Sequence, residues 1–258
     1  MNLHRKSPLL ASALLAMILA SQARADSVPQ PYGETPSACC FTWTGFYYGV
    51  NAGAAWNDSP DIRFTGTDTG SLGLPSRAKL DWGTSFTGGV QGGYNWQLSK
   101  LVVGVEADLQ WLNAYANFST VSTNPDTTSA YREINMLATL RARMGVAVWE
   151  RSLLYVTGGL AVGDANVRIS SSCPTCTNTN VTSASADTPI GWAFGGGYEA
   201  ALSERVSFKA EYLHFDLGQN QTTVTPNTSP MTGKVRDEGN LVRIGVNLRF
   251  GQPSPSYK

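Results

Sequence analysis

Residues 132–148, "REINMLATLRARMGVAV", decide the fold. Apolar residues occupy every second position from Ile134 to Val148, while residues such as Glu133, Arg141 and Arg143 lie between them. This period of two is typical of a β-strand with one apolar and one polar face, and an α-helix with a period of 3.6 does not produce it. The stretch therefore predicts a long strand that separates two different environments.

Seven further segments share this alternation. They are residues 43–56, 84–96, 101–112, 153–163, 190–202, 206–212 and 241–250. Three connections are tight turns, "QLSK", "WERS" and "LSER", whereas the other four are long and polar. Short turns on one side and long loops on the other are typical of bacterial outer-membrane barrels. We therefore predict an all-β fold: an eight-stranded antiparallel transmembrane up-and-down β-barrel with four long outer loops and three short periplasmic turns.

A soluble barrel such as a lipocalin is the alternative, and the placement of charge argues against it. Soluble barrels keep apolar residues inside, whereas here the polar face carries both signs along single strands and the apolar face carries almost no charge. Tryptophan supports the membrane barrel, because such rings collect where membrane meets water. All seven tryptophans lie at or near predicted strand ends: Trp43, Trp56, Trp82, Trp96, Trp111, Trp149 and Trp192.

The N-terminus predicts export. A basic start, "MNLHRK", precedes an apolar run of twelve residues, and Ala23 and Ala25 supply the small residues of a cleavage site. Twelve apolar residues fall short of the ~20 that a membrane-spanning helix needs. We predict a signal peptide at 1–25, a periplasmic linker at 26–42, the barrel at 43–250 and a tail at 251–258. The mature chain keeps 16 of the 19 basic residues against 19 acidic ones, a net charge of −3, which argues against nucleic-acid binding.

Two segments resemble a known family. "FTWTGFYYGVNAGAAW" at 41–56 and "LVRIGVNLRF" at 241–250 are similar to the opening and closing strands of OmpA-like, porin-family outer-membrane proteins and surface antigens of Gram-negative bacteria. The resemblance extends from about Phe41 to Phe250 and implies a barrel in the outer membrane. In that family the barrel-assembly machinery recognises a terminal aromatic residue, which implies a role for Phe250. Because "GQPSPSYK" follows, either the signal is internal or Tyr257 contributes.

The polar face predicts the content of the lumen. Its charged residues are Glu106, Asp108, Glu133, Glu199, Glu211, Arg141, Arg143, Lys209, Arg243 and Arg249. Acids and bases balance, and eight strands leave an interior that side chains can fill. We therefore expect an ion-paired plug, with a narrow channel for small solutes as the alternative. From this facing we also expect Leu140→Arg, on the lipid face, to be more damaging than Arg141→Gln.

An outer-membrane enzyme is the third hypothesis. His214 is the histidine left after processing, and Asp216 could orient its ring. No Ser, Asp or Glu arrangement completes a site, so we predict no catalytic residues, no cofactor and no metal. The glycine-rich "TGGVQGGY" and "FGGGYE" lie within strands and do not open helices, which excludes a phosphate-binding loop.

The cysteines fall at opposite ends of the barrel. Cys39 and Cys40 precede the first strand, whereas Cys173 and Cys176 lie in an outer loop. An apolar band of about 25 Å separates the pairs, which is too far for a disulfide between them. We predict a local disulfide between Cys173 and Cys176.

Together these features predict a structural, surface-exposed outer-membrane protein that contributes to envelope integrity. Its expected partners are outer-membrane lipid, lipopolysaccharide and the barrel-assembly machinery, and a monomer is expected. Ligands of the loops are not indicated by their generic polar composition.

Overall fold

The computed structural model describes residues 41–57, 61–66, 77–79, 81–121, 127–149, 151–172, 181–224 and 231–250. These residues belong to the second of two compact units, 38–258. The predicted signal peptide, both cysteine pairs and the C-terminal tail lie outside the described residues. In the part of the chain that the structure describes, no helix has the length and apolar character needed to cross a membrane.

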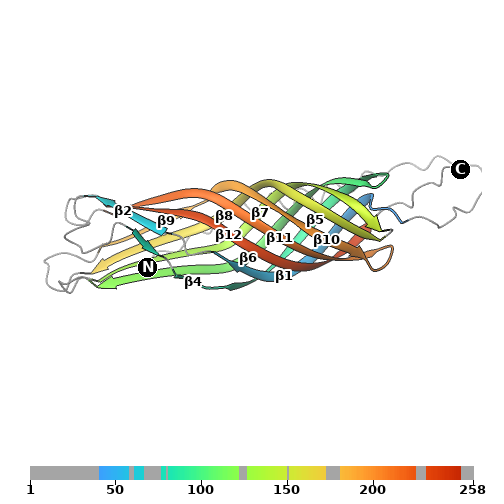
Figure 1. The fold of residues 1–258 in the computed structure, drawn as a ribbon. Helices are drawn as coiled ribbons and strands as arrows, with labels where there is room; N and C mark the ends of the chain where they lie inside the picture. Colours follow the sequence, from blue (N-terminus) through green and yellow to red (C-terminus); the bar gives the residue numbers. More distant parts are fainter. Residues whose placement is uncertain are drawn as a thin grey trace, which may run out of the picture. The chain divides into compact units, whose positions relative to one another are not determined.

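Eight long strands form a closed antiparallel ring (Figure 1). In ring order they are β1 (Gly45–Trp56), β5 (Ser85–Leu98), β6 (Leu101–Val121), β7 (Thr127–Trp149), β8 (Ser152–Ser172), β10 (Ile190–Ala201), β11 (Val206–Val224) and β12 (Met231–Phe250). Pairing of β1 with β12 closes the ring, with Phe46 opposite Phe250 and Trp56 opposite Asn240. The eight-stranded antiparallel barrel predicted from the sequence is confirmed.

The outer connections contain more strand than the sequence predicted. Four short strands occur there: β2 (Asp61–Gly66), β3 (Arg77–Lys79), β4 (Asp81–Trp82) and β9 (Val181–Asp187). Among these short strands, β2 pairs with β12, β3 with β2, β4 with β6 and β9 with β8. Five of the long strands also extend well beyond their predicted ends: β6, β7, β8, β11 and β12. These extensions, such as the "TTSAYRE" that begins β7, carry polar residues on both faces and so give no alternation to detect.

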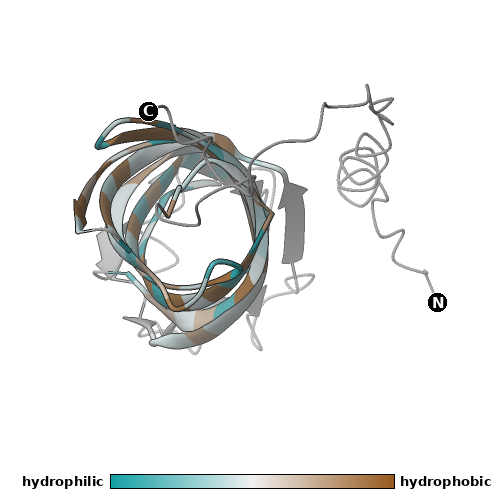
Figure 2. Cartoon of the chain, turned by 90° about the vertical axis from the view of Figure 1, so that its right-hand side faces the viewer, coloured by the Kyte–Doolittle hydropathy of each residue, from teal (hydrophilic) through white to brown (hydrophobic). Residues whose placement is uncertain are grey.

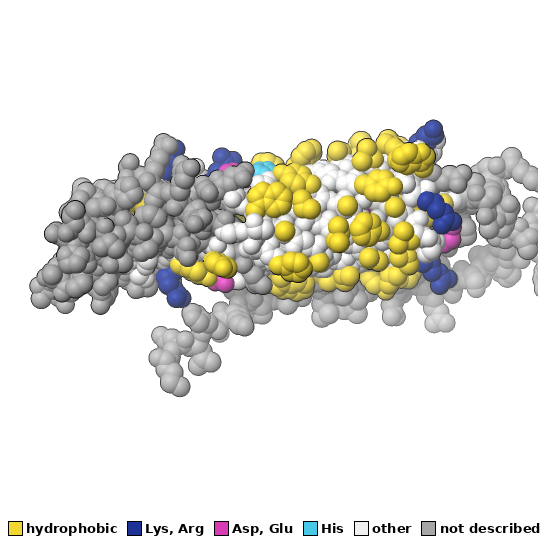
Figure 3. All heavy atoms as spheres, turned by 60° about the horizontal axis from the view of Figure 1, so that its bottom comes forward, with side chains coloured by type: hydrophobic (Ala, Val, Ile, Leu, Met, Phe, Trp, Pro, Cys, Tyr) yellow, Lys and Arg dark blue, Asp and Glu magenta, His cyan; other side chains and the backbone are white. Residues whose placement is uncertain are grey.

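The barrel wall has an apolar outer surface (Figure 3). Figure 2, which looks along the barrel, shows hydrophobic and hydrophilic residues alternating along the strands. Large hydrophobic side chains point outward and are exposed, among them Phe86 at 78%, Ile190 at 70% and Leu140 at 51%. Figure 3 shows this belt in yellow, with Lys and Arg side chains beyond both of its ends. An exposed apolar surface of this extent is typical of contact with a membrane.

A β-bulge on β7 places Glu133 and Ile134 on the opposite faces from those that the sequence predicted. Against β8 the register shifts between Ile134 and Met136, so Asn135 has no partner in β8, and against β6 the shift lies between Trp111 and Ala114. One inserted residue moves every side chain beyond it to the other face. Ile134 is consequently buried, whereas the alternation had placed it on the lipid face. Glu133 lies on the outer side of this strand, and its predicted inward position is wrong.

Candidate functional site: the filled lumen

The centre of the lumen holds a network of ion pairs. Arg141 of β7 contacts three carboxylates: its Nη2 lies 2.6 Å from Glu106 Oε1 and 2.7 Å from Asp108 Oδ2, and its Nη1 lies 3.3 Å from Glu211 Oε1. Arg243 of β12 lies 3.1 Å from Asp108 Oδ1 and 2.5 Å from Glu211 Oε2. The network therefore joins β6, β7, β11 and β12 across the interior.

Two further bases complete the network. Lys209 Nζ lies 2.9 Å from Glu106 and 3.7 Å from Glu211, and Arg143 Nη2 lies 2.8 Å from Glu199 Oε2. The structure thus brings together eight of the residues that the sequence placed in the lumen: Glu106, Asp108, Arg141, Arg143, Glu199, Lys209, Glu211 and Arg243. Four are acids and four are bases, and none is more than 5% exposed. Charges removed from water need this kind of pairing to be tolerated.

Two predicted members lie elsewhere. Glu133 points away from the lumen because of the bulge at Asn135. Arg249 is buried near the periplasmic mouth, where it donates a 2.5 Å hydrogen bond to the Thr42 carbonyl oxygen and lies over the rings of Phe41 and Trp43. Arg249 forms no ion pair with the described carboxylates of the network.

Uncharged side chains satisfy the remaining carboxylate oxygens, and sequence reasoning missed them. Tyr47 donates a 2.7 Å hydrogen bond to Glu106, and Tyr155 donates one of 2.9 Å to Glu211. Further donors to the carboxylates are Thr139 to Asp108, Ser207 to Glu199 and Asn247 to Glu199. All of them lie on the polar face, so the same alternation could have identified them if it had been applied to uncharged residues.

Glycines make room for the two tyrosines. A Cβ at Gly93 would lie 2.5 Å from the Tyr47 hydroxyl oxygen, and one at Gly197 would lie 2.6 Å from that of Tyr155. These distances are much shorter than a van der Waals contact. Each tyrosine side chain therefore packs directly against a glycine, where a Cβ would leave no room for it. This packing accounts for one glycine in each of the two glycine-rich stretches, which the sequence had already excluded as phosphate loops.

Gly197→Val is expected to lower the free energy of unfolding by about 1 to 3 kcal/mol, because its Cβ would meet both the Ala210 carbonyl oxygen and the Tyr155 hydroxyl and would displace that hydroxyl from Glu211. Urea unfolding of the refolded barrel, followed by tryptophan fluorescence, measures the change. Gly88→Val is the matched control, since a Cβ at Gly88 meets only the Asn51 carbonyl oxygen at 3.7 Å. Equal stability of the two variants would show that the close packing at Gly197 does not contribute to the stability of the barrel.

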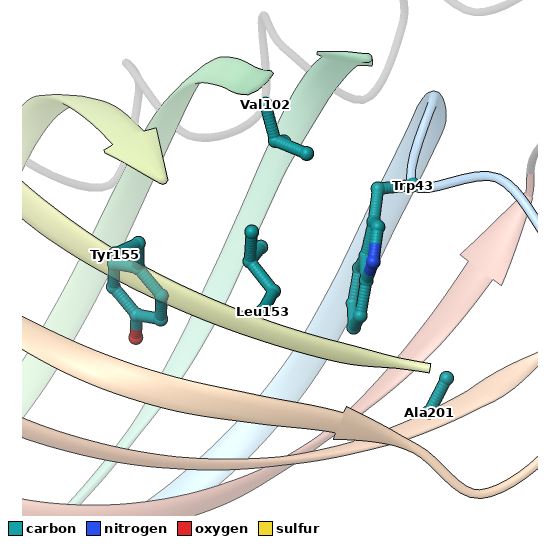
Figure 4. Packing of buried hydrophobic residues seen from close by; sticks show 5 residues of the cluster. All are labelled: Trp43, Val102, Leu153, Tyr155 and Ala201. Carbon is teal, nitrogen blue, oxygen red and sulfur yellow. The ribbon is translucent and has the colours of Figure 1, made fainter. Parts of the chain in front are cut away.

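An apolar cluster closes the periplasmic end of the lumen. Trp43, Val102, Leu153, Tyr155 and Ala201 are buried together, as Figure 4 shows, and Phe41 packs against them. The segment before β1 is held there because the Trp43 backbone N–H donates a 2.7 Å hydrogen bond to Gln97 Oε1. The N-terminal segment therefore covers the mouth of the barrel.

A second group of buried apolar side chains lies toward the outer end, beyond the charge network. It comprises Leu112, Ile134, Leu137, Leu213, Phe215, Leu217 and Leu241, each no more than 3% exposed. Phe215 lies against Gly239, and Leu217 lies against Gly163. Beyond Ile134 on β7, Arg132 forms a buried ion pair with Asp237 of β12. In the described residues the lumen thus holds an apolar layer, the charged network, a second apolar layer and then the Arg132–Asp237 pair.

The remaining sequence candidates, His214 and Asp216, lie on the outward face of β11, and Asp216 is buried there. Register places His214 opposite the outward Phe194, and its Nδ1 lies 3.0 Å from Asn240 Oδ1. Asp216 accepts a 2.8 Å hydrogen bond from the Gly218 N–H and pairs with Arg236 at 2.5 Å. Both side chains are thus engaged by other partners. Among the described residues, no group of three or more His, Cys, Asp and Glu side chains could hold a metal ion.

Phe250 ends the last strand on the lipid-facing surface. Its side chain is 57% exposed, and its ring stacks on Tyr48 of β1 with centroids 5.4 Å apart. The predicted assembly signal therefore lies at the seam where the first and last strands meet, accessible from outside the barrel.

Comparison with known proteins gives consistent matches over almost the whole chain. The model of the family described as "outer membrane protein beta-barrel domain" matches residues 10–250. The chain is 33% identical to a 31 kDa outer-membrane immunogenic protein of Brucella melitensis, over 95% of this chain and 100% of the relative. It is 29% identical to a 22 kDa outer membrane protein of Rhizobium leguminosarum, over 84% of this chain and 82% of the relative. Among solved structures, Neisserial surface protein A matches 84% of this chain and 100% of its own, with 16% identity and a TM-score of 0.38.

Proposed function

Since the chain belongs to the outer membrane protein β-barrel domain family, we propose that it acts in the outer membrane as a closed structural barrel that supports envelope integrity. The observation that carries this proposal is the buried ion-pair network. Its eight charged side chains cross the lumen and balance one another, so a solute would have to break several desolvated ion pairs to pass.

The two apolar layers support the same proposal. The Trp43 cluster covers the periplasmic mouth, and the layer that contains Phe215 and Leu217 covers the outer side. A water-filled channel needs a continuous polar path, and both layers place buried apolar side chains in that path. In this proposal the apolar belt contacts lipid and lipopolysaccharide, the assembly machinery recognises the chain end at Phe250, and the outer hairpins are the part reached from outside the cell. Brucella relatives named immunogenic proteins support that last point.

Planar-bilayer recording tests the closed barrel. The purified full chain is expected to insert without stable conductance steps, because its lumen is filled. The double variant Glu106→Ala/Arg141→Ala removes one acid and one base, so the net charge of the lumen stays the same. Its current is expected to be noisier than that of the unaltered protein. Regular, voltage-stable steps from the unaltered protein would replace the structural role with a channel. In cells, deletion of the gene is expected to raise sensitivity to detergent, whereas slower uptake of small solutes with an intact envelope would also favour the channel.

A further inference from the structure

The periplasmic end of the lumen holds a buried positive charge that no acid neutralises. Besides the four acids and four bases of the central network, the inside of the barrel contains the Arg132–Asp237 pair and Arg249. Among the described residues that are buried inside the barrel, six bases therefore face five acids. Arg249 is the base in excess: it is 6% exposed, and it forms no ion pair with a described carboxylate. A buried charge without a counter-charge is costly to the folded state.

The contacts of Arg249 satisfy only part of its guanidinium group. Nη2 donates a hydrogen bond to the Thr42 carbonyl oxygen, and the group lies 4.4 Å from the centre of the Phe41 ring and 4.7 Å from that of the Trp43 ring. The ring faces attract a cation but carry no formal charge. Nη1 is buried, and among the described residues it has no acceptor.

Trp43, which Figure 4 shows, supplies a second donor beside Arg249. Its side chain is 1% exposed, and its indole Nε1 has no acceptor among the described residues. An indole N–H only donates, and a buried tryptophan usually finds an acceptor for it. Because the Arg249 guanidinium lies over the Trp43 ring, the two unpartnered donors belong to adjoining side chains.

A third unpartnered donor in this part of the lumen lies beside an unpartnered acceptor. Arg143 Nε and Asn95 Oδ1 are both buried without a partner. A Cβ at Gly104 would lie 2.4 Å from Asn95 Oδ1 and 3.2 Å from Arg143 Cγ, so these two side chains adjoin. Donor and acceptor are matched there, whereas Trp43 and Arg249 present two donors and an excess positive charge.

We propose that Trp43 Nε1–H and Arg249 Nη1–H bind a small monovalent anion of the halide class, with chloride as the natural occupant. One negative charge balances the excess, and hydrogen bonds between charged groups are the strong ones. Burial selects for size, since both side chains are almost closed to solvent. A halide ion needs about the room of one water molecule, roughly 30 Å³, whereas phosphate is much larger.

Such an anion ties the N-terminal segment to the end of the last strand. Trp43 precedes β1, and Arg249 is the penultimate residue of β12, where it pairs with Tyr47. Closure of the periplasmic mouth then depends on the halide concentration. This property goes beyond the structural role proposed above, and it does not depend on whether the lumen conducts.

The halide dependence of stability tests the site. The full chain is refolded in detergent without halide, and its urea unfolding is followed by tryptophan fluorescence in sodium chloride and in sodium gluconate at equal ionic strength. A ligand that binds the folded state stabilises it as its concentration rises, so the unaltered barrel is expected to unfold at a higher urea concentration in chloride. Arg249→Gln removes the charge, and Trp43→Phe keeps a ring but removes the N–H. Each is expected to weaken the apparent halide affinity at least about tenfold.

Arg205→Gln and Trp149→Phe are the matched controls, because both residues are exposed at the short turns. They are expected to keep the halide dependence of the unaltered protein. Bromide gives a readout that needs no variant to fold. Crystals of the unaltered protein in sodium bromide are expected to show anomalous scattering within hydrogen-bond distance of Trp43 Nε1 and Arg249 Nη1.

Three results would overturn the proposal. The first is equal stability of the unaltered protein in chloride and gluconate, which would mean that water satisfies both donors. The second is an undiminished halide dependence in Arg249→Gln, which would mean a general salt effect. The third is bromide found only at other places, an adventitious ion only. None of these results changes the bilayer recording, so failure here and failure of the closed barrel are distinguishable.

Discussion

Arg141→Gln is expected to lower the free energy of unfolding of the barrel by about 3 to 5 kcal/mol, because it leaves buried carboxylates without their partner. Arg141 contacts Glu106, Asp108 and Glu211, and all four side chains are at most 2% exposed. Without its charge the network holds four acids and three bases. Urea unfolding in lipid vesicles, followed by tryptophan fluorescence, measures the loss.

A compensating substitution separates charge balance from packing. Arg141→Gln/Asp108→Asn restores equal numbers of acids and bases, and the new amide oxygen at 108 can still accept from Arg243. The double variant is expected to recover a large part of the loss. Arg151→Gln is the control, since its pair with Glu204 is 2.8 Å long but exposed, and such pairs contribute about 0 to 1 kcal/mol. If Arg141→Gln costs no more than this control, the lumen is hydrated and the plug is refuted.

Leu140→Arg is expected to cost about 2 to 4 kcal/mol and to slow assembly, since it places a cation on the lipid face near the middle of the membrane. Leu140 pairs with Ala107 and Leu160 at the centre of the wall, and half of its side chain is exposed. The same unfolding experiment measures it, with the yield of heat-modifiable barrel as a second readout.

The control for depth is Leu202→Arg. Leu202 is also outward and exposed, but it adjoins the short turn between β10 and β11. Near the membrane surface an arginine costs only about 0 to 1 kcal/mol. Equal effects at 140 and 202 would contradict the placement of the belt.

These two expectations change what the sequence alone implied. Facing was enough to place Leu140 outside and Arg141 inside, because an alternating pattern records the face of each residue directly. It could not show that Arg141 also contacts Glu211 of β11, since that contact crosses the lumen between strands that are not neighbours. Arg141→Gln, expected to be the milder change, is now expected to be at least as severe.

The failures of prediction have a common physical origin. The alternation holds only while the register is unbroken, so the single extra residue at Asn135 exchanged the faces of Glu133 and Ile134. The outer strands escaped detection because water or protein lies on both of their sides, which removes the contrast that produces a period of two. The membrane-spanning part of each strand could be predicted from the sequence, because lipid on one side and the polar lumen on the other impose an alternation of apolar and polar residues.

The seam between β1 and β12 sets the order in which the barrel can form. Tyr47 of the first strand donates to Glu106, and Arg243 of the last strand contacts Asp108, so the network joins the two ends of the barrel. Until these ends meet, the contacts that span the seam cannot form. Arg141–Glu106 and Arg243–Glu211 join neighbouring strands and need no closure, whereas contacts that span the seam, such as Arg243–Asp108, need both ends in place and are expected to form late. Opening at the seam must break these contacts, so they are expected to slow the opening of the closed barrel as well as to stabilise it.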